Sequence, residues 1–239
     1  MEGIKMPFRI IKNDITKMET DAIVNAANSR LLEGGGVCGA IFAAAGTDEL
    51  RKACKEIGFC KTGDAVITKG FNLKAKYIIH TVGPVYGVNP KEEKYQLYSC
   101  YQKSLEIAKE KQLESIAFPL ISSGIYGYPK EEAIEIATDA IRNFLLENEM
   151  QIYLVIYDKN SFVINEKLFN IVKRHIENSC MESDAIKSTS FITIDDSAQF
   201  TDYSISENTS AEPKEKAIYP TANLGSLERK ESIGGLLNQ

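Results

Sequence analysis

Residues 25–46 read NAANSRLLEGGGVCGAIFAAAG, and the remainder of the chain can be interpreted outward from them. An apolar run at 22–24 comes before this stretch and predicts a buried strand. Small apolar residues from Val37 to Ala45 predict a helix packed closely against a sheet. The three glycines between strand and helix let a ligand approach the backbone, and N–H groups at a helix start bind anions. The alternative is a flexible turn from strand to helix, because a single glycine-rich loop is a weak signal.

Apolar periodicity predicts alternating strands and helices through the first three quarters of the chain. Such alternation is typical of a three-layer α/β/α sandwich with a mainly parallel central sheet. The connection between the strands expected at 63–69 and 77–82 is too short for a crossover helix, so the sheet is expected to be mixed. The expected strands are 8–11, 22–25, 63–69, 77–82, 115–118 and 152–156, and the expected helices are 37–45, 47–57, 92–112, 130–146 and 161–178. Tyr98 and Tyr101 share one face of the helix at 92–112, which indicates core packing.

Charge and composition divide the chain at residue 180. Residues 1–180 hold 23 basic and 23 acidic residues, so this expected domain is neutral, which argues against a nucleic-acid surface. Residues 181–239 hold 5 basic and 10 acidic residues and are rich in Ser and Thr. This composition predicts a disordered acidic tail. One hypothesis is therefore an interaction scaffold whose tail docks an unknown partner.

The cysteines and histidines suggest neither a disulfide framework nor a metal site. The five cysteines lie at positions 38, 54, 60, 100 and 180, with no C-x-x-C pair, and the only histidines are His80 and His175. We expect no metal and no cofactor. The N-terminus lacks the apolar region of a signal peptide, and no apolar run reaches the ~18 residues needed to span a bilayer. The sequence predicts a cytoplasmic protein with reduced thiols and no membrane contact.

Four segments follow expected strands, at the sheet edge where α/β proteins bind ligands. They are 14–15, 25–37, 122–126 and 157–158. Two of them carry glycines and precede helices, and two helix N-termini facing one crevice suit two linked phosphates. Neither G-x-x-x-x-G-K-[ST] nor G-x-G-x-x-G is present. The sequence therefore favours an organic diphosphate bound without an obligatory metal.

Three spaced motifs resemble the macrodomain family. They are NAAN-x-x-L-x-x-GGGV-x-x-AI from residue 25, HTVGP from residue 80 and FPLISSGIYGYP from residue 118. The resemblance covers residues 7 to about 178. It implies binding of ADP-ribose, free or attached to protein. In many members of the family it also implies hydrolysis of ADP-ribosyl esters on acidic side chains or on acetate.

The resemblance also assigns roles within the expected site. Asp14 would accept a hydrogen bond from the adenine amine, with Ile15 beside it, and Tyr157 would stack on adenine. Asn28 would hydrogen-bond the distal ribose near the scissile carbon. The remaining expected ligand contacts, on either side of the diphosphate, are Gly35, Gly36, Val37, Ser122, Gly124, Ile125 and Tyr126, and Tyr126 would also cover the distal ribose.

Several of these residues have a purely structural alternative. Asp14 could cap a turn, because aspartate is common in that role. Tyr157 could be a core aromatic, and His80 is expected to be a satisfied core histidine. Asn25 is expected to brace the loop backbone and not to contact ligand.

Cys38 departs from the family pattern. The strongest hydrolases of the family have Asp after GGGV and, in many, His four residues later, where this chain has Cys38 and Phe42. The first hypothesis is an ester hydrolase in which Asn28 orients water and a substrate phosphate takes its proton. The second is a reader module that binds ADP-ribose without turnover. A nucleophilic Cys38 is a third possibility, which would require a base and a lowered pKa.

Overall fold

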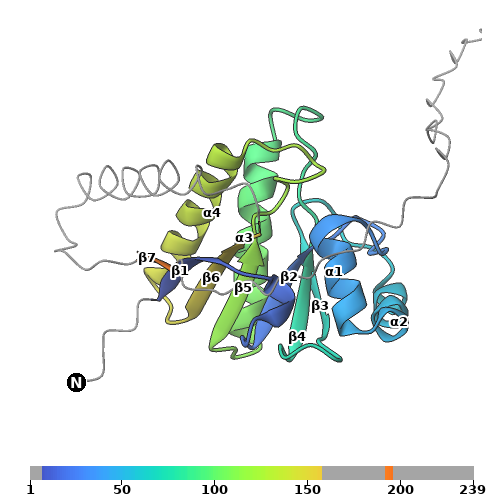
Figure 1. Ribbon diagram of the computed structural model, residues 1–239. Helices are drawn as coiled ribbons and strands as arrows, with labels where there is room; N and C mark the ends of the chain where they lie inside the picture. Colours follow the sequence, from blue (N-terminus) through green and yellow to red (C-terminus); the bar gives the residue numbers. More distant parts are fainter. Residues whose placement is uncertain (1–6, 158–191, 196–239) are drawn as a thin grey trace, which may run out of the picture. The chain divides into compact units, whose positions relative to one another are not determined.

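A seven-stranded sheet forms the centre of the computed structural model, which describes residues 7–157 and 192–195 (Figure 1). The strand order is β3-β4-β2-β5-β6-β1-β7. Only β3 runs antiparallel to its neighbour, β4, and the other described pairs are parallel. The strands are β1 (Phe8–Lys12), β2 (Ala22–Ala26), β3 (Ala65–Lys69), β4 (Tyr77–Thr81), β5 (Ser115–Pro119), β6 (Gln151–Ile156) and β7 (Ile192–Asp195). The predicted mixed, mainly parallel sheet is confirmed.

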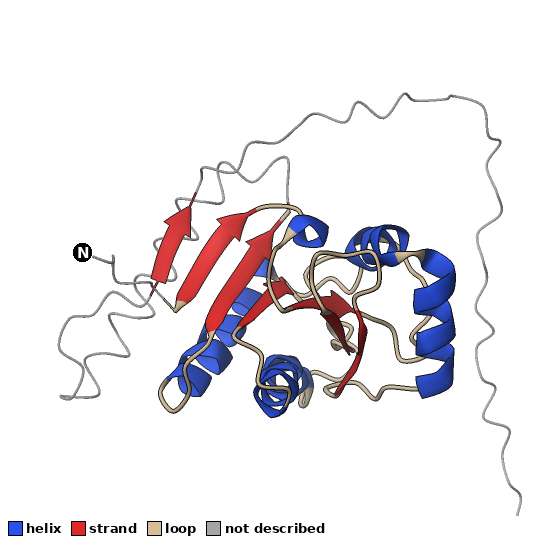
Figure 2. Cartoon of the chain, turned by 90° about the horizontal axis from the view of Figure 1, so that it is seen from below, coloured by secondary structure: helices blue, strands red, loops and turns tan. Residues whose placement is uncertain are grey.

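Helices cover both faces of this sheet (Figures 1 and 2). They are α1 (Gly36–Ala45), α2 (Thr47–Ile57), α3 (Glu93–Glu110) and α4 (Lys130–Leu145), with a short 3-10 helix, η1 (Ile15–Lys17). Neighbouring residues of β2 show how the layers are separated, because successive side chains of a strand point to opposite faces. Ile23 packs in the cluster with α1 and α2, whereas Val24 packs in the cluster with α3 and α4. The predicted three-layer α/β/α sandwich is confirmed.

The expected elements within the described residues all form, with ends that shift by two residues or fewer. Tyr101, on the helix face assigned to core packing, is fully buried, and its hydroxyl accepts a hydrogen bond from the Ile121 N–H at 3.1 Å. The helix expected at 161–178 lies outside the described residues. Within the described part of the chain, no helix combines the length and the apolar character that crossing a membrane requires.

Strand β7 corrects the expected disorder of the tail at one place. Residues 192–195 lie within 181–239, yet they pair in parallel with β1, from Phe8 opposite Ile192 to Ile11 opposite Asp195. The β-branched residues Ile192, Thr193 and Ile194 favour a strand, but this short run lies within a polar tail and was not recognised from composition. β1 offers it an unpaired edge, and backbone hydrogen bonds to that edge do not depend on the composition of the added segment. The rest of the predicted tail lies outside the described residues.

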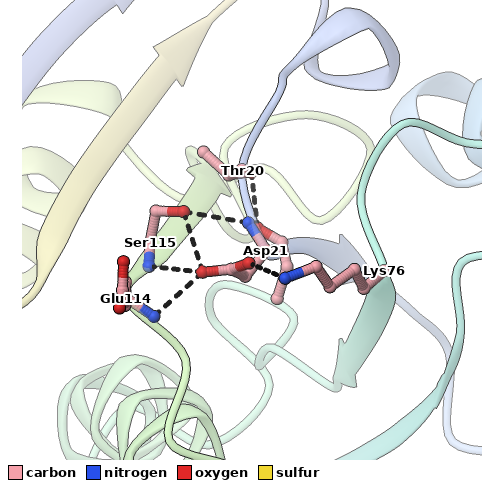
Figure 3. Close-up of polar contacts among 6 residues, drawn as sticks. Thr20, Asp21, Lys76, Glu114 and Ser115 are labelled. Atoms are coloured by element: carbon pink, nitrogen blue, oxygen red, sulfur yellow. Dashed lines mark hydrogen bonds and ion pairs between the residues drawn. The ribbon is translucent and has the colours of Figure 1, made fainter.

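Asp21 links the starts of β2, β4 and β5 through hydrogen bonds, at the end of the sheet opposite the glycine loops (Figure 3). Its Oδ1 atom accepts a hydrogen bond from Lys76 Nζ at 2.8 Å. Its Oδ2 atom accepts from the Glu114 N–H at 2.9 Å and the Ser115 N–H at 3.2 Å. The Asp21 side chain is only 17% exposed. The hydrogen bond from Lys76 lowers the pKa of Asp21, with further lowering by the Glu114 N–H.

We expect Asp21→Ala to lower the free energy of unfolding by about 2–3 kcal/mol at pH 7, because two backbone donors lose a charged acceptor. The pKa of Asp21 is lower in the folded state, so Asp21 stabilises the fold above its unfolded pKa of about 3.9. This stabilisation is lost as the pH falls and the carboxylate is protonated. Urea unfolding at pH 7 and pH 3 should therefore show a smaller difference between variant and wild type at pH 3. Glu19→Ala is the control, because Glu19 pairs with Lys74 on the surface, and we expect a much smaller effect on the free energy of unfolding. An equal effect of both substitutions would contradict the role of Asp21.

Candidate functional site

A pocket of about 430 Å³ lies at the carboxyl ends of the parallel strands. Its wall comes from the ends of β1, β5 and β6, from the starts of α1 and α4, and from the loop after β5. The lining residues are Asp14, Ile15, Gly36, Val37, Ala40, Pro119, Leu120, Ser123, Gly124, Lys130, Ile134, Val155, Ile156 and Tyr157. Most of these are apolar, as is usual for sites that bind small molecules.

Asp14 and Tyr157 lie at the end of the pocket formed by β1 and β6. The Asp14 Oδ1 atom accepts hydrogen bonds from the Thr16 N–H at 2.9 Å and the Thr16 hydroxyl at 2.7 Å. Asp14 therefore caps η1, which confirms the structural alternative, and it also lines the pocket. Tyr157 is 64% exposed and lines the same pocket, so it is not a core aromatic.

The glycine loop brings the start of α1 to the pocket wall. Gly35 occupies the N-cap position and provides no side-chain hydrogen bond to the first turn. Gly36 has a φ of +60°, a backbone conformation that disfavours other residues. Gly39 allows the loop to pack on the helix, because a Cβ there would lie 2.6 Å from the Gly34 carbonyl oxygen. Gly36 and Val37 line the pocket, and their expected contact with a diphosphate stays a prediction.

The loop after β5 contributes Ser123 and Gly124 to the pocket, while Ser122 turns inward. Ser122 has a φ of +64° and is buried, and its Oγ atom has no hydrogen-bond partner among the described residues. Gly83 leaves the space for it, since a Cβ on Gly83 would lie 2.1 Å from the Ser122 Oγ atom. The close contact explains the glycine of the HTVGP motif. Beyond this loop, α4 begins at Lys130 after Pro129, so two helix N-termini border the pocket.

Ile125 and Tyr126 lie beside the pocket and not in its wall. Ile125 is 83% exposed, and its Cδ1 atom lies 3.3 Å from the position that a Cβ on Gly35 would take. The loop after β5 therefore reaches the glycine loop at this point. Burial raises the pKa of Tyr126, and Cys38 adds to the effect. The expected contacts of Gly35, Ser122, Ile125 and Tyr126 with a ligand stay predictions.

Asn28 braces the loop, a role that the sequence assigned to Asn25. The Asn28 Nδ2 atom donates to the Leu32 carbonyl at 2.6 Å, and its Oδ1 atom accepts from the Leu32 N–H at 3.1 Å. Asn28 does not line the pocket, but its Nδ2 atom lies 3.9 Å from the position that a Cβ on Gly34 would take. The asparagine is therefore beside the glycine loop, next to the pocket.

A buried polar network lies beneath the loop and includes Asn25, His80 and Cys38. The Asn25 Nδ2 atom donates to His80 Nδ1 at 3.1 Å and to the Cys38 Sγ atom at 3.7 Å. This pattern assigns the His80 proton to Nε2, which lies 2.9 Å from the Thr68 hydroxyl. Burial lowers the pKa of His80 to about 4, so the ring is neutral at pH 7. His80 is a satisfied core histidine, as predicted.

Cys38 is a protonated, buried thiol. Its side chain is 5% exposed, and its Sγ atom donates to the Leu32 carbonyl at 3.8 Å. Burial raises the pKa of Cys38 despite the hydrogen bond from Asn25. Because a nucleophilic cysteine needs a lowered pKa, the structure disfavours a nucleophilic role. Among the described residues, no group of three or more His, Cys, Asp and Glu side chains is placed to hold a metal ion.

The sequence did not identify eight of the lining residues, which are Ala40, Pro119, Leu120, Ser123, Lys130, Ile134, Val155 and Ile156. Four of them are apolar residues within predicted strands or helices, where sequence gives no sign of a ligand, and Pro119 and Leu120 directly follow a predicted strand. Ser123 lies in the predicted ligand segment 122–126, and the place of Lys130 at the start of the helix after the second loop could have indicated it. Its cationic side chain reaches the pocket wall at the same helix start.

The sheet order and the pocket define an α/β protein with a ligand site at the carboxyl ends of its strands. Comparison with known proteins agrees: a family model for the Macro domain matches residues 24–137. A macro domain-containing protein of Methanosarcina mazei is 52% identical over 167 residues, which are 67% of this chain and 89% of that protein. The chain therefore belongs to the macro domain family, as the sequence motifs predicted.

Two similar proteins are named ADP-ribose glycohydrolase MACROD2. The protein of Xenopus laevis is 49% identical over 166 residues, which are 69% of this chain and 38% of that protein. The protein of Mus musculus is 40% identical over 223 residues, which are 93% of this chain and 43% of that protein. This chain thus spans less than half the length of either.

Two solved structures have the same fold. The Oceanobacillus iheyensis macrodomain with ADP has a TM-score of 0.64 and 41% identity, and the match covers 72% of this chain and 92% of that chain. The Trypanosoma brucei macrodomain in complex with ADP-ribose has a TM-score of 0.62 and 36% identity, and the match covers 71% of this chain and 69% of that chain.

Proposed function

We propose that this protein binds ADP-ribose and hydrolyses ADP-ribosyl esters on acidic side chains or on acetate. The observation that carries the proposal is the pocket that runs from Asp14 and Tyr157 to the glycine loop. It is mainly apolar and bordered by two helix N-termini, a combination that suits a nucleoside diphosphate. The names of the MACROD2 relatives support the same reaction class.

In this proposal the pocket holds ADP-ribose with the adenine between Asp14 and Tyr157. The Asp14 carboxylate accepts from the exocyclic amine, and Tyr157 stacks on the ring. The glycine loop and the loop after β5 donate backbone N–H groups to the diphosphate. The distal ribose then lies beyond Gly36, towards Asn28 and Tyr126.

The hydrolytic step in the proposal needs no ionised side chain. Water attacks the anomeric carbon of the distal ribose, the bond from that carbon to the ester oxygen breaks, and the carboxylate leaves. A phosphate oxygen of the substrate takes the proton of the water. Asn28 fixes the loop beside this carbon and orients the water, while the protonated Cys38 takes no part in proton transfer.

A non-catalytic reader is the second candidate, and the neutral Cys38 favours it, because general-base assistance is typically worth about 10²–10⁴ in rate. The two functions separate in one experiment. A glutamate-ADP-ribosylated protein is incubated with this protein, and the release of free ADP-ribose is followed. Release supports the hydrolase, whereas unchanged label together with tight ADP-ribose binding supports the reader.

We expect Asp14→Ala to weaken ADP-ribose binding by about 1.5–3 kcal/mol, since a hydrogen bond to a charged acceptor is lost. This loss corresponds to roughly 10- to 150-fold in the dissociation constant. Calorimetric titration measures it, and AMP should lose affinity to the same extent. Asp48→Ala is the matched control, because Asp48 pairs with Arg51 on the exposed side of α2. Equal affinity of wild type and Asp14→Ala would exclude Asp14 from the adenine site.

A further inference from the structure

Four exposed apolar side chains lie on the loops after β4 and β5, which contact each other through Tyr86 and Tyr126. Val85, Tyr86 and Val88 are 43%, 43% and 75% exposed, and Ile125 is 83% exposed. We name these four residues the apolar rim. They belong to two segments without any charge, residues 81–90 and 115–129, in a chain that is 26% charged. Exposed apolar groups that gather in this way mark binding surfaces more often than chance positions do.

The rim is held firmly by contacts beneath it. The Tyr86 N–H donates to the Tyr126 carbonyl at 2.9 Å, and the rings of Tyr86 and Tyr128 meet edge to face with centroids 5.1 Å apart. The Gly87 N–H donates at 2.8 Å to a carboxylate oxygen of Glu93, which is only 7% exposed. A surface fixed in this way loses little conformational entropy when a partner binds.

The rim lies at the end of the pocket away from the adenine position. In the sheet, β2 and β5 separate β4 from β6 and β1, which carry Tyr157 and Asp14. Val85, Tyr86 and Val88 follow β4, and Ile125 lies against Gly35. Figure 1 shows the loops after β4 and β5 side by side above the sheet. The loop that carries Val85, Tyr86 and Val88 therefore contacts, at Tyr126, the loop that lines the pocket with Ser123 and Gly124.

We propose that the apolar rim binds the polypeptide that carries the ADP-ribosyl group, through apolar residues next to the modified acidic side chain. The inference rests on the proposed function, in which the distal ribose points towards the rim. Ile125 is the one rim residue expected to contact free ADP-ribose, so Val85, Tyr86 and Val88 have a use only when the distal ribose is attached to a larger molecule. The uncharged loops match an apolar peptide segment and offer no cation for an anionic membrane or a nucleic acid.

The test measures binding, so it does not depend on turnover. Two peptides carry ADP-ribose through a stable, non-hydrolysable link, one with Leu and Val next to the linked residue and the other with Gly and Ser. We expect the wild-type protein to bind the Leu/Val peptide about tenfold more tightly than the Gly/Ser peptide, the scale of burying one apolar side chain. Val88→Ser should remove most of this preference and leave the affinity for free ADP-ribose unchanged.

Leu146→Ser is the matched control, because Leu146 is 55% exposed and follows the C-terminus of α4, the end of the helix opposite the one that borders the pocket. It should change none of the affinities. The inference is overturned if the wild type binds both peptides equally, or if Val88→Ser retains the full preference. Absence of binding to free ADP-ribose by the wild type would overturn the proposed function, and the inference with it.

Discussion

Replacing Cys38 by aspartate is expected to raise the rate of ADP-ribosyl ester hydrolysis by a factor on the order of 10²–10⁴, the usual size of general-base assistance. Burial keeps the present thiol protonated, so it supplies no base at neutral pH. An aspartate carboxyl has an unperturbed pKa of about 3.9 and would be ionised. Burial at this 5% exposed position would raise the pKa of the carboxyl towards neutrality, and a general base is most effective when its pKa lies near the working pH.

Two neighbours of Cys38 would orient the new carboxylate. The Asn25 Nδ2 atom, now 3.7 Å from Sγ, would donate a hydrogen bond to it, whereas the Leu32 carbonyl oxygen, now the acceptor of the thiol, would repel it. Both effects direct the carboxylate away from the Leu32 backbone. The rate of ester hydrolysis by the Cys38→Asp variant should rise with pH as the new carboxyl group ionises. ADP-ribose itself should bind more weakly, because a negative charge is added close to the diphosphate.

Single-turnover release of ADP-ribose from a glutamate-linked substrate measures the effect, with Cys38→Ala as the control. The alanine variant should keep nearly the wild-type rate, since the thiol takes no part in the reaction. Loss of activity in Cys38→Ala would contradict this account and support a nucleophilic thiol. Iodoacetamide would then label Cys38 first and ADP-ribose would protect it, whereas the buried, protonated thiol predicts slow labelling.

Replacing Asn28 by alanine is expected to lower turnover at least 10²-fold in both the wild type and the Cys38→Asp variant. The substitution removes two hydrogen bonds to the backbone of Leu32, whose carbonyl then keeps only the weak thiol donor. The loop that carries Gly34 loses its brace, and the attacking water loses its orientation. A misplacement of about 1 Å at a reacting centre can cost roughly 10²-fold in rate.

Asn143→Ala is the matched control, because Asn143 also uses its side-chain amide in a hydrogen bond, to the Tyr98 hydroxyl at 3.1 Å, but lies on α4 outside the pocket wall. It should leave turnover unchanged. Thermal unfolding of both variants separates a local effect from a general loss of stability. Full activity in a folded Asn28→Ala protein would remove Asn28 from the reaction.

The sequence determined the architecture because the periods of apolar residues are local. The alternation of strands and helices, the mixed sheet and the core face of the helix with Tyr101 all follow from residues close together in the chain. The glycine loop, Asp14 and Tyr157 were also predicted, since strand ends of a parallel sheet meet at one edge. The spaced motifs then indicated the macrodomain family.

Only the tertiary structure decided how neighbouring polar residues divide their roles. The two asparagines of the NAAN motif look alike in sequence, yet Asn25 points down to His80, and Asn28 points to Leu32. Ser122 and Ser123 differ in the same way, because the left-handed backbone at Ser122 turns its side chain inward beneath Gly83. One residue along a turn reverses the direction of a side chain, and neither composition nor periodicity records it.

Long-range packing also fixed the properties that sequence could not assign. Burial, which depends on segments distant in the chain, raised the pKa of Cys38 and lowered that of His80. The fold brought the loops after β4 and β5 into contact, where the Tyr86 N–H donates to the Tyr126 carbonyl, although 40 positions separate these residues in the chain. β7 pairs with the edge of β1, a partner far away in the chain that local sequence does not reveal, although Ile192, Thr193 and Ile194 are themselves strand-forming residues.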